Sequence, residues 1–260
     1  MRIARFAGDD DPRFGVIGDD NGVPTIAVLN GDPLYAGLNL SGQKIPLADV
    51  RLLAPVIPRS KVVCVGKNYA KHAAEMGGEV PEEPLIFLKP NTSVIGPGEP
   101  IFYPEQSSNV HFEGELAVVI GRICRDISVE DAPKVIFGYT VANDVTARDL
   151  QKKDGQWARA KGFDTFCPLG PWIETDFDPS AVRVTTRLNG DVHQDGNTSD
   201  MVFTVPDVIA YVSSFMTLLP GDVILTGTPD GVGPMVVGDE VSVSVEGIGT
   251  LTNTVVSRND

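Results

Sequence analysis

The feature that most constrains the fold is the stretch 111–121, in which two glutamates precede an apolar run. Glu113 and Glu115 stand two positions apart, and residues 116–120 are aliphatic and rich in β-branched side chains. Such a run is typical of a strand that is buried in a core. Side chains at positions i and i+2 of a strand lie on one face, about 7 Å apart along the chain. The stretch therefore predicts a buried strand with two carboxylates that converge at its start.

Two carboxylates at the edge of a core require a positive partner, because burying like charges without one costs several kcal/mol. Arginine or lysine could be that partner, and so could a hard metal ion that prefers oxygen ligands. A pair of solvated edge residues remains an alternative, since a Glu-x-Glu pair by itself has low specificity. The rest of the chain has to distinguish between these possibilities.

Charge and composition exclude several classes of partner. The chain has 260 residues, 42% of them hydrophobic, which is enough for a sizeable core. Its formal charge of −14 argues against binding nucleic acid or an anionic membrane, since both favour basic surfaces.

Neither the N-terminus nor the cysteines indicate export. No apolar targeting segment opens the chain, and no run of about 18 apolar residues follows. Cys64, Cys124 and Cys167 are odd in number and lack Cys-x-x-Cys spacing, so they indicate neither a disulfide framework nor a zinc knuckle. We expect a cytoplasmic protein.

The chain divides at its prolines into a small β domain, 1–55, and a main domain, 56–260. In the first part, residues 2–6, 13–17 and 25–29 read as short strands separated by turn residues. In the main domain, strands are predicted at 62–65, 85–90, 101–103, 139–142, 182–188, 240–245 and 249–256, the first two of them buried. Asn189-Gly190 predicts a tight hairpin turn, with His193 exposed just beyond it.

Two helices are predicted in the main domain. Ser128 and Asp131 resemble a capping box, which predicts a helix over 129–137 that ends at Gly138. A second helix begins at Thr204 and Pro206. Its apolar side is formed by Val208, Ile209, Val212, Phe215, Met216 and Leu219.

A glycine-flanked segment, 66–78, has the character of a mobile lid with a short helix. On that helix His72 and Glu75 are three residues apart and share a face. A carboxylate there could orient the imidazole so that both groups bind a water molecule. A solvated pair on a surface helix is the simpler alternative.

Further candidate groups lie on separate loops. Asp144 follows the strand predicted at 139–142, where it either faces a crevice or caps a helix. Lys161 lies in 157–171, which lacks a clear period and predicts an ordered loop. Thr228 lies in a glycine-rich turn that lacks the features of a phosphate loop and suits close approach to a small ligand. This inventory favours metal-assisted chemistry on a small oxyanion.

The order of five motifs resembles the fumarylacetoacetate hydrolase family. They are Gly66-Lys67-Asn68-Tyr69-Ala70 through Glu75, Phe112-Glu113-Gly114-Glu115-Leu116, Asn143-Asp144-Val145-Thr146-Ala147-Arg148-Asp149, Lys161-Gly162-Phe163-Asp164-Thr165-Phe166-Cys167-Pro168, and Leu225 to Gly233. The chain is most similar to the short branch with acylpyruvate hydrolases, 2-hydroxyhepta-2,4-diene-1,7-dioate isomerases and oxaloacetate decarboxylases. The resemblance covers residues 61 to the C-terminus.

The resemblance implies an α+β, mainly β fold: a mixed β-roll or β-sandwich catalytic domain with a few short helices, beside the small N-terminal β domain. It also implies a homodimer. Mg²⁺ or Mn²⁺ would be held by the residues matching Glu113, Glu115 and Asp144. Longer members of the family bring a fourth acidic ligand that has no equivalent here, and water would fill the remaining positions of an octahedral ion.

The same match implies roles for the other residues. His72, Glu75 and Lys161 would be catalytic. The substrate would contact Gln151, Arg148, Thr228, Tyr69 and Gly227.

The activity we expect is C–C bond hydrolysis of an acylpyruvate or fumarylpyruvate, in which the cation stabilises the enolate and His72 activates a water. Oxaloacetate decarboxylation or tautomerisation on the same site is the alternative. A binding module without turnover is the alternative from another class.

Overall fold

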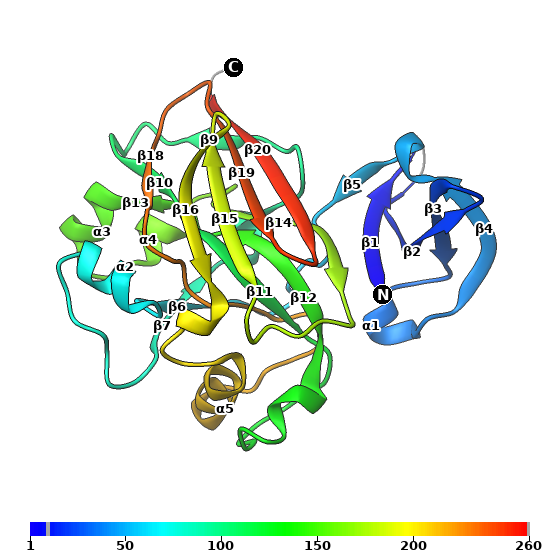
Figure 1. The fold of residues 1–260 in the computed structure, drawn as a ribbon, viewed down its shortest axis with the longest axis horizontal. Coiled ribbons are helices and arrows are strands. Elements are labelled where there is room, and N and C mark those ends of the chain that lie inside the picture. The colour runs from blue at the N-terminus through cyan, green and yellow to red at the C-terminus, as the bar shows by residue number, and fades with distance from the viewer. Residues whose placement is uncertain (9–10, 259–260) are drawn as a thin grey trace.

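The strands of the N-terminal region form a smaller lobe beside the main body (Figure 1). The structure is a computed structural model and describes residues 1–8 and 11–258. The elements of the smaller lobe are β1 Arg2–Ala7, β2 Arg13–Asp20, β3 Val23–Leu29, α1 Pro33–Ala36, β4 Leu40–Pro46, the 3₁₀ turn η1 Leu47–Asp49 and β5 Arg51–Leu53. The three strands predicted here are confirmed.

One large sheet continues from the smaller lobe into the main body. Within the described residues it has 12 strands, in the order β4-β3-β2-β1-β14-β12-β11-β17-β6-β7, with β5 paired to β1 and β8 to β14. The strands outside the smaller lobe are β6 Val62–Gly66, β7 Leu85–Lys89, β8 Val94–Ile95, β11 Gly114–Ile120, β12 Ile136–Asn143, β14 Cys167–Glu174 and β17 Val223–Leu225. The junction is a short antiparallel ladder in which Arg2 and Ile3 of β1 pair with Glu174 and Ile173 of β14.

Two smaller sheets complete the main body. A five-stranded sheet, in the order β16-β15-β19-β20-β9, is built from β9 Ile101–Tyr103, β15 Arg183–Leu188, β16 Asp191–Asn197, β19 Glu240–Val245 and β20 Gly249–Ser257. A three-stranded sheet is built from β10 Val110–Phe112, β13 Thr146–Ala147 and β18 Gly233–Met235. The hairpin at Asn189 and Gly190 has positive φ at both residues, +52° and +90°, as the predicted tight turn requires.

The helices are few and short. They are α2 Ala70–Glu75, α3 Arg148–Asp154, α4 Ala158–Lys161 and α5 Val205–Phe215, with 3₁₀ turns η2 Asn91–Ser93, η3 Ala132–Val135 and η4 Thr198–Asp200. The predicted α+β, mainly β fold class is confirmed. Across residues 1–8 and 11–258, no helix combines the length and apolar character needed to cross a membrane.

The core surrounds β11, whose seven residues are all buried. Leu116, Val118 and Ile120 contact the cluster that includes residues of the five-stranded sheet and α5. Ala117 and Val119 belong to the cluster on the opposite face, together with β6 and β17. Because both faces of β11 are covered, the groups at its N-terminal end are held in a dry, rigid frame.

Gly114 explains how the two glutamates can be so deeply placed. A Cβ at this position would lie 2.1 Å from Thr186 Oγ1 and 2.9 Å from Val243 Cγ1. Only glycine allows the start of β11 to lie this close to the five-stranded sheet.

Two predicted elements differ in the structure. The helix predicted over 129–137 is wrong: only the 3₁₀ turn η3 forms, and β12 begins at Ile136. The Ser128 side chain does accept a hydrogen bond from Asp131 N, at 3.3 Å, but it closes a turn. Residues 136–143 pair with β11 along its whole length, and Gly138 lies within that ladder. Tertiary pairing therefore overrides the local helix signal.

The ordered loop predicted over 157–171 is wrong in part. Residues 158–161 form α4, and β14 begins at Cys167. Pro168, Gly170 and Pro171 hide this strand from sequence patterns, since proline and glycine are rare inside strands. The segment before Cys167 does approach the candidate site described below.

Two predicted burial patterns are also corrected. β7 was expected to be buried, but Leu85 and Leu88 are 37% and 45% exposed because β7 is the edge strand of the large sheet. The helix predicted from Thr204 is confirmed as α5, and Thr204 and Asp207 form a capping box. Its apolar face is shorter than expected, because α5 ends at Phe215 and that side chain is 47% exposed.

Candidate active site

Three carboxylates meet at the N-terminal end of β11. Glu113 lies at the junction of β10 and β11, Glu115 lies on β11, and Asp144 directly follows β12. One oxygen from each lies within 4.8 Å of the others, and all three residues are buried. Two hydrogen bonds hold the backbone at Glu113 in place: its carbonyl oxygen accepts from Asp144 N, and its N–H donates to the side-chain oxygen of Asn143. The predicted convergence of Glu113 and Glu115 is confirmed, and Asp144 lies beside them.

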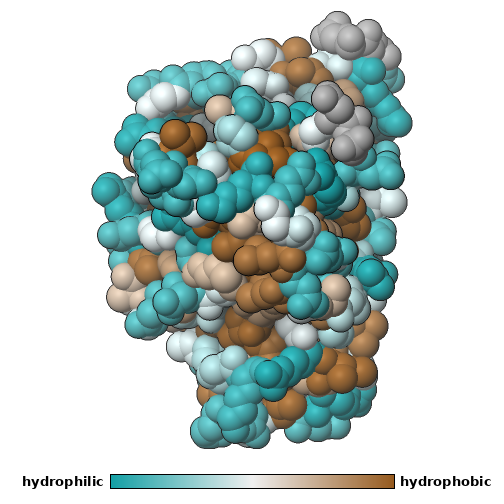
Figure 2. All heavy atoms as spheres, turned by 90° about the vertical axis from the view of Figure 1, so that its right-hand side faces the viewer, coloured by the Kyte–Doolittle hydropathy of each residue, from teal (hydrophilic) through white to brown (hydrophobic). Residues whose placement is uncertain are grey.

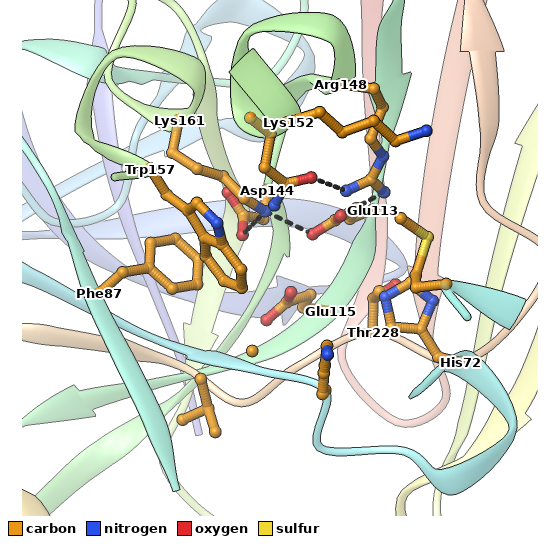
Figure 3. Close-up of a pocket in the computed structure, with 15 residues that line it drawn as sticks. His72, Phe87, Glu113, Glu115, Asp144, Arg148, Lys152, Trp157, Lys161 and Thr228 are labelled. Atoms are coloured by element: carbon orange, nitrogen blue, oxygen red, sulfur yellow. Dashed lines mark hydrogen bonds and ion pairs between the residues drawn. The ribbon is translucent and has the colours of Figure 1, made fainter. Parts of the chain in front are cut away.

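Three cations contact two of these carboxylates, and Figure 3 shows two of the three, Lys161 and Arg148. Lys161 Nζ lies 2.8 Å from Glu113 and 2.6 Å from Asp144. Lys89 Nζ lies 2.6 Å from the other Asp144 oxygen, and Arg148 lies 2.5 Å from Glu113. Burial alone would raise the pKa of Glu113, but Arg148 and Lys161 outweigh burial and hold its pKa well below the usual range.

Glu115 has a different environment. It is 1% exposed, and its side chain accepts one hydrogen bond, 2.7 Å from Gly227 N. No lysine or arginine of the described chain forms an ion pair with it, and Figure 3 shows it below the ion pairs without a link to the other residues drawn. Burial, followed by the charges of Asp144 and Glu113, raises its pKa well above the ordinary value.

The donor set of this triad fits a hard divalent cation. A buried carboxylate beside two others, with no cation of its own, is costly until a positive ion neutralises it. Three carboxylate oxygens within a few ångströms match the oxygen ligands and small site that Mg²⁺ or Mn²⁺ takes.

Lys161 projects from α4 between two of the three carboxylates. Burial alone would lower its pKa, but Asp144 and Glu113 outweigh burial and raise it. Lys161 is therefore an ammonium group at neutral pH, so it can donate hydrogen bonds but cannot act as a general base. It also lies 4.8 Å above the ring centre of Phe87.

His72 reaches the pocket from α2. Its Nδ1 lies 3.2 Å from Glu75 Oε2, which leaves Nε2 for a group in the pocket. The Glu75 carboxylate in turn accepts from Gly231 N, at 3.1 Å and 3.3 Å. The predicted pair is therefore present, and it joins the lid helix to the glycine-rich turn after β17.

Thr228 lines the pocket, but its hydroxyl is already engaged. It donates to Gly114 O at 2.8 Å and accepts from Gln194 Nε2 at 2.7 Å. Gln194 Oε1 also accepts from Gly114 N, at 2.9 Å. Because its proton is committed, Thr228 can offer a substrate only an acceptor lone pair.

The pocket has a volume of about 210 Å³ and gathers most of the predicted residues. Those lining it are His72, Glu113, Glu115, Asp144, Arg148, Gln151, Lys161 and Thr228. Arg148 donates to Gln151 Oε1 at 3.1 Å. Tyr69, Gly227 and Glu75 lie outside the lining. Tyr69 is buried, Gly227 N donates a hydrogen bond to Glu115, and Glu75 contacts His72.

Several site residues were not predicted from sequence. Phe87 and Trp157 form an aromatic wall with ring centres 5.2 Å apart. Lys89 stands behind Asp144, and Gln194 comes from the distant strand β16. A lysine at the end of an apolar run was the one available signal for Lys89, since lysine is rarely buried without a partner.

Comparison with known proteins gives consistent matches. Residues 61–256 match the family described as fumarylacetoacetate (FAA) hydrolase C-terminal, and residues 1–55 match one described as Rv2993c-like, N-terminal. Protein Rv2993c of Mycobacterium tuberculosis is 54% identical over 263 residues, which cover 99% of each chain. Human oxaloacetate tautomerase FAHD2A, mitochondrial, is 48% identical over 224 residues, covering 82% of this chain and 71% of that protein.

Two solved structures are similar in fold and sequence. The 2-hydroxyhepta-2,4-diene-1,7-dioate isomerase from Mycobacterium marinum matches with a TM-score of 0.92 and 52% identity, covering 100% of both chains. The maleylpyruvate hydrolase from Sphingobium sp. SYK-6, in complex with manganese(II) ion and pyruvate, matches with a TM-score of 0.80 and 35% identity, covering 99% of both chains. With the five motifs contributing to one buried site and residues 61–256 matching the family model, the chain belongs to the fumarylacetoacetate hydrolase family.

Proposed function

We propose that the protein is a divalent-metal-dependent enzyme that interconverts the enol and keto forms of a small 2-oxo acid such as oxaloacetate. The observation that carries this proposal is the triad: Glu115 is buried beside Glu113 and Asp144 without a cationic partner. The names of two relatives, a tautomerase and an isomerase, favour this alternative over the hydrolysis that we expect from the motifs alone.

Glu113, Glu115 and Asp144 would hold Mg²⁺ or Mn²⁺. When bound, such an ion supplies Lewis acidity that stabilises negative charge on the substrate's oxygens. The relative solved with manganese(II) and pyruvate supports this choice of metal and of substrate head.

The chain's own residues supply the proton transfer. His72 Nε2 faces the pocket while Glu75 fixes the ring through Nδ1, so the imidazole can remove the enol O–H proton and a proton can be returned to carbon. Lys161 donates to two carboxylates and keeps a third N–H for the oxygen on which charge develops. The reaction is a balanced isomerisation, because one proton leaves oxygen and one arrives at carbon.

The test is to follow ketonisation of enol-oxaloacetate with Mg²⁺ or Mn²⁺, before and after chelation. We expect turnover that falls to the uncatalysed rate with a chelator and returns when metal is added. Decarboxylation of oxaloacetate is followed in the same samples by release of CO₂. Turnover that is unchanged by thorough chelation would contradict the proposal.

Hydrolysis of an acylpyruvate is the second candidate. It is favoured by the His72–Glu75 pair, which could activate a water, and by the relative named maleylpyruvate hydrolase. Acetylpyruvate and fumarylpyruvate test it directly. In His72→Ala, loss of hydrolysis with decarboxylation retained would assign His72 to water activation, whereas equal loss of both would reject that assignment.

A binding protein without turnover is the alternative from another class. Metal binding with no turnover of any of these substrates would favour it. The intact His72–Glu75 pair and the protonated Lys161 argue against this alternative.

A further inference from the structure

The cations nearest the triad already have carboxylate partners. Lys161 contacts Glu113 and Asp144, Lys89 contacts Asp144, and Arg148 contacts Glu113. Each of them therefore already shares its charge with a carboxylate of the chain. A dianion would also meet an unfavourable overall field, because the chain carries a formal charge of −14.

Lys152 differs from these cations. It lies on α3, four residues after Arg148, so the two side chains share one face of the helix. It lines the pocket, it is exposed, and its side chain forms no ion pair or hydrogen bond with any residue that the structure describes.

Lys67 is a second lining lysine, but its ammonium group is directed elsewhere. Lys67 Nζ would lie 2.5 Å from a Cβ at Gly78, so it lies against the chain just after α2. Lys152 is therefore the better placed of the two for a ligand in the pocket.

The pocket has two unlike walls (Figure 3). Phe87 and Trp157 form the aromatic wall on one side, and Lys152 extends past Arg148 toward the side on which His72 lies. A 2-oxo acid with its head at the triad would extend its remaining atoms between these walls. A charged tail would be stabilised near Lys152, whereas a neutral tail gains nothing from it.

We propose that Lys152 binds the second carboxylate of the substrate and so makes the enzyme selective for dicarboxylic 2-oxo acids over those with a neutral tail. This inference rests on the proposed function, because it assumes that the head of the 2-oxo acid lies at the triad.

The experiment compares oxaloacetate with pyruvate, which shares the 2-oxo acid head and lacks the second carboxylate. For Lys152→Met we expect the KM for oxaloacetate to rise about fivefold, the effect of one partly exposed ion pair. The inhibition constant of pyruvate should stay within about twofold of the wild-type value, a change too small to represent a lost ion pair. Lys152→Arg, which keeps the charge, should restore most of the affinity.

Lys153→Met is the matched control. Lys153 follows on the same helix, is exposed and carries the same charge, but it does not line the pocket. It should leave both constants unchanged. Three results would overturn the inference. They are equal effects of the two Met variants, equally weaker binding of oxaloacetate and pyruvate in Lys152→Met, and a Lys152→Met variant in which neither constant changes.

The inference can also be tested if the proposed function is wrong. If the wild-type protein turns over no 2-oxo acid, calorimetry with malate and lactate replaces the kinetic assay, since these differ in the second carboxylate. Binding of malate that weakens in Lys152→Met while lactate is unaffected supports the inference without turnover. Indifference of both ligands to the substitution rejects it.

Discussion

Glu113 and Glu115 show how two identical residues, two positions apart, acquire opposite electrostatic roles. Glu113 is bound by Arg148 and Lys161, so its charge is stabilised without any metal. Glu115 has only a backbone donor, and folding raises its pKa. The folded metal-free protein therefore holds the Glu115 proton more tightly than the unfolded chain does, and deprotonation of Glu115 lowers stability.

This difference predicts opposite effects of one substitution at the two positions. In the presence of a chelator, Glu115→Gln should raise the free energy of unfolding by about 1 kcal/mol or more, because it removes a buried charge that lacks a partner. Glu113→Gln should destabilise the protein by about 3 kcal/mol, because Arg148 loses its carboxylate and Lys161 loses one of two. Denaturant unfolding at several pH values measures both.

The advantage of Glu115→Gln should depend on pH. Because the pKa of Glu115 is raised on folding, its destabilising effect grows as pH rises above the unfolded value of about 4.3. The advantage of Glu115→Gln should therefore increase with pH until the raised pKa is passed. A Glu115→Gln protein that is less stable than wild type in chelator would contradict this account of the site.

The site residues that could be predicted from the sequence are those that lie within short, recognisable motifs. The triad, Lys161 and the His72–Glu75 pair belong to the five motifs whose order resembles the family, and that order made them predictable. Gln194 could not, since it reaches Thr228 only through the packing of β16 against the glycine-rich turn. Lys89 is similar, because nothing near it in the sequence shows that Asp144 will be its partner.

At the scale of elements, α2 is held against the body of the protein through its last residue. Glu75 ends the helix and accepts from Gly231 N, and it also orients His72. Gly231 has a φ of +93°, and a Cβ there would lie 2.1 Å from His193 O. The contact that positions the lid therefore depends on glycine at this place in the turn.

Gly231→Ala should displace the turn and free Glu75, so we expect kcat/KM to fall by about tenfold or more, as small misplacements of catalytic groups do. Amide hydrogen exchange in α2 should become faster. Gly77→Ala is the control, since Gly77 also has a positive φ, +71°, but open space around it. That variant should lose about 1 kcal/mol of stability and keep its activity. Equal loss of activity in both variants would show that the contact is not what positions the lid.

Elements were predictable where local pattern and tertiary pairing agree. The strands β1, β6, β15 and β19 alternate or run apolar in sequence, and they form as expected. Residues 129–137 failed because pairing of β12 with β11 outweighs a local capping signal. β14 was missed because its prolines and glycine look like loop residues, although the ladder with β12 and β1 holds them extended.

At the scale of the whole molecule, the smaller lobe extends the large sheet without contributing to the pocket. Of the residues 1–8 and 11–55 that the structure describes in this part of the chain, none lines the pocket. Figure 2 views the molecule from the side of this lobe and shows hydrophobic residues gathered on the lower half of that face. Leu38 and Leu40 are among the lobe's exposed apolar residues. The homodimer remains a prediction, as do the domain boundary and the cytoplasmic location.

Calorimetric titration of the metal-free protein with Mn²⁺, comparing wild type with Glu115→Gln, tests whether the triad holds a divalent metal ion. We predict that each wild-type chain binds a single Mn²⁺ ion, and that Glu115→Gln loses this binding although its metal-free form is more stable. Mn²⁺ binding of equal affinity in both proteins, or no binding to wild type, would contradict this prediction.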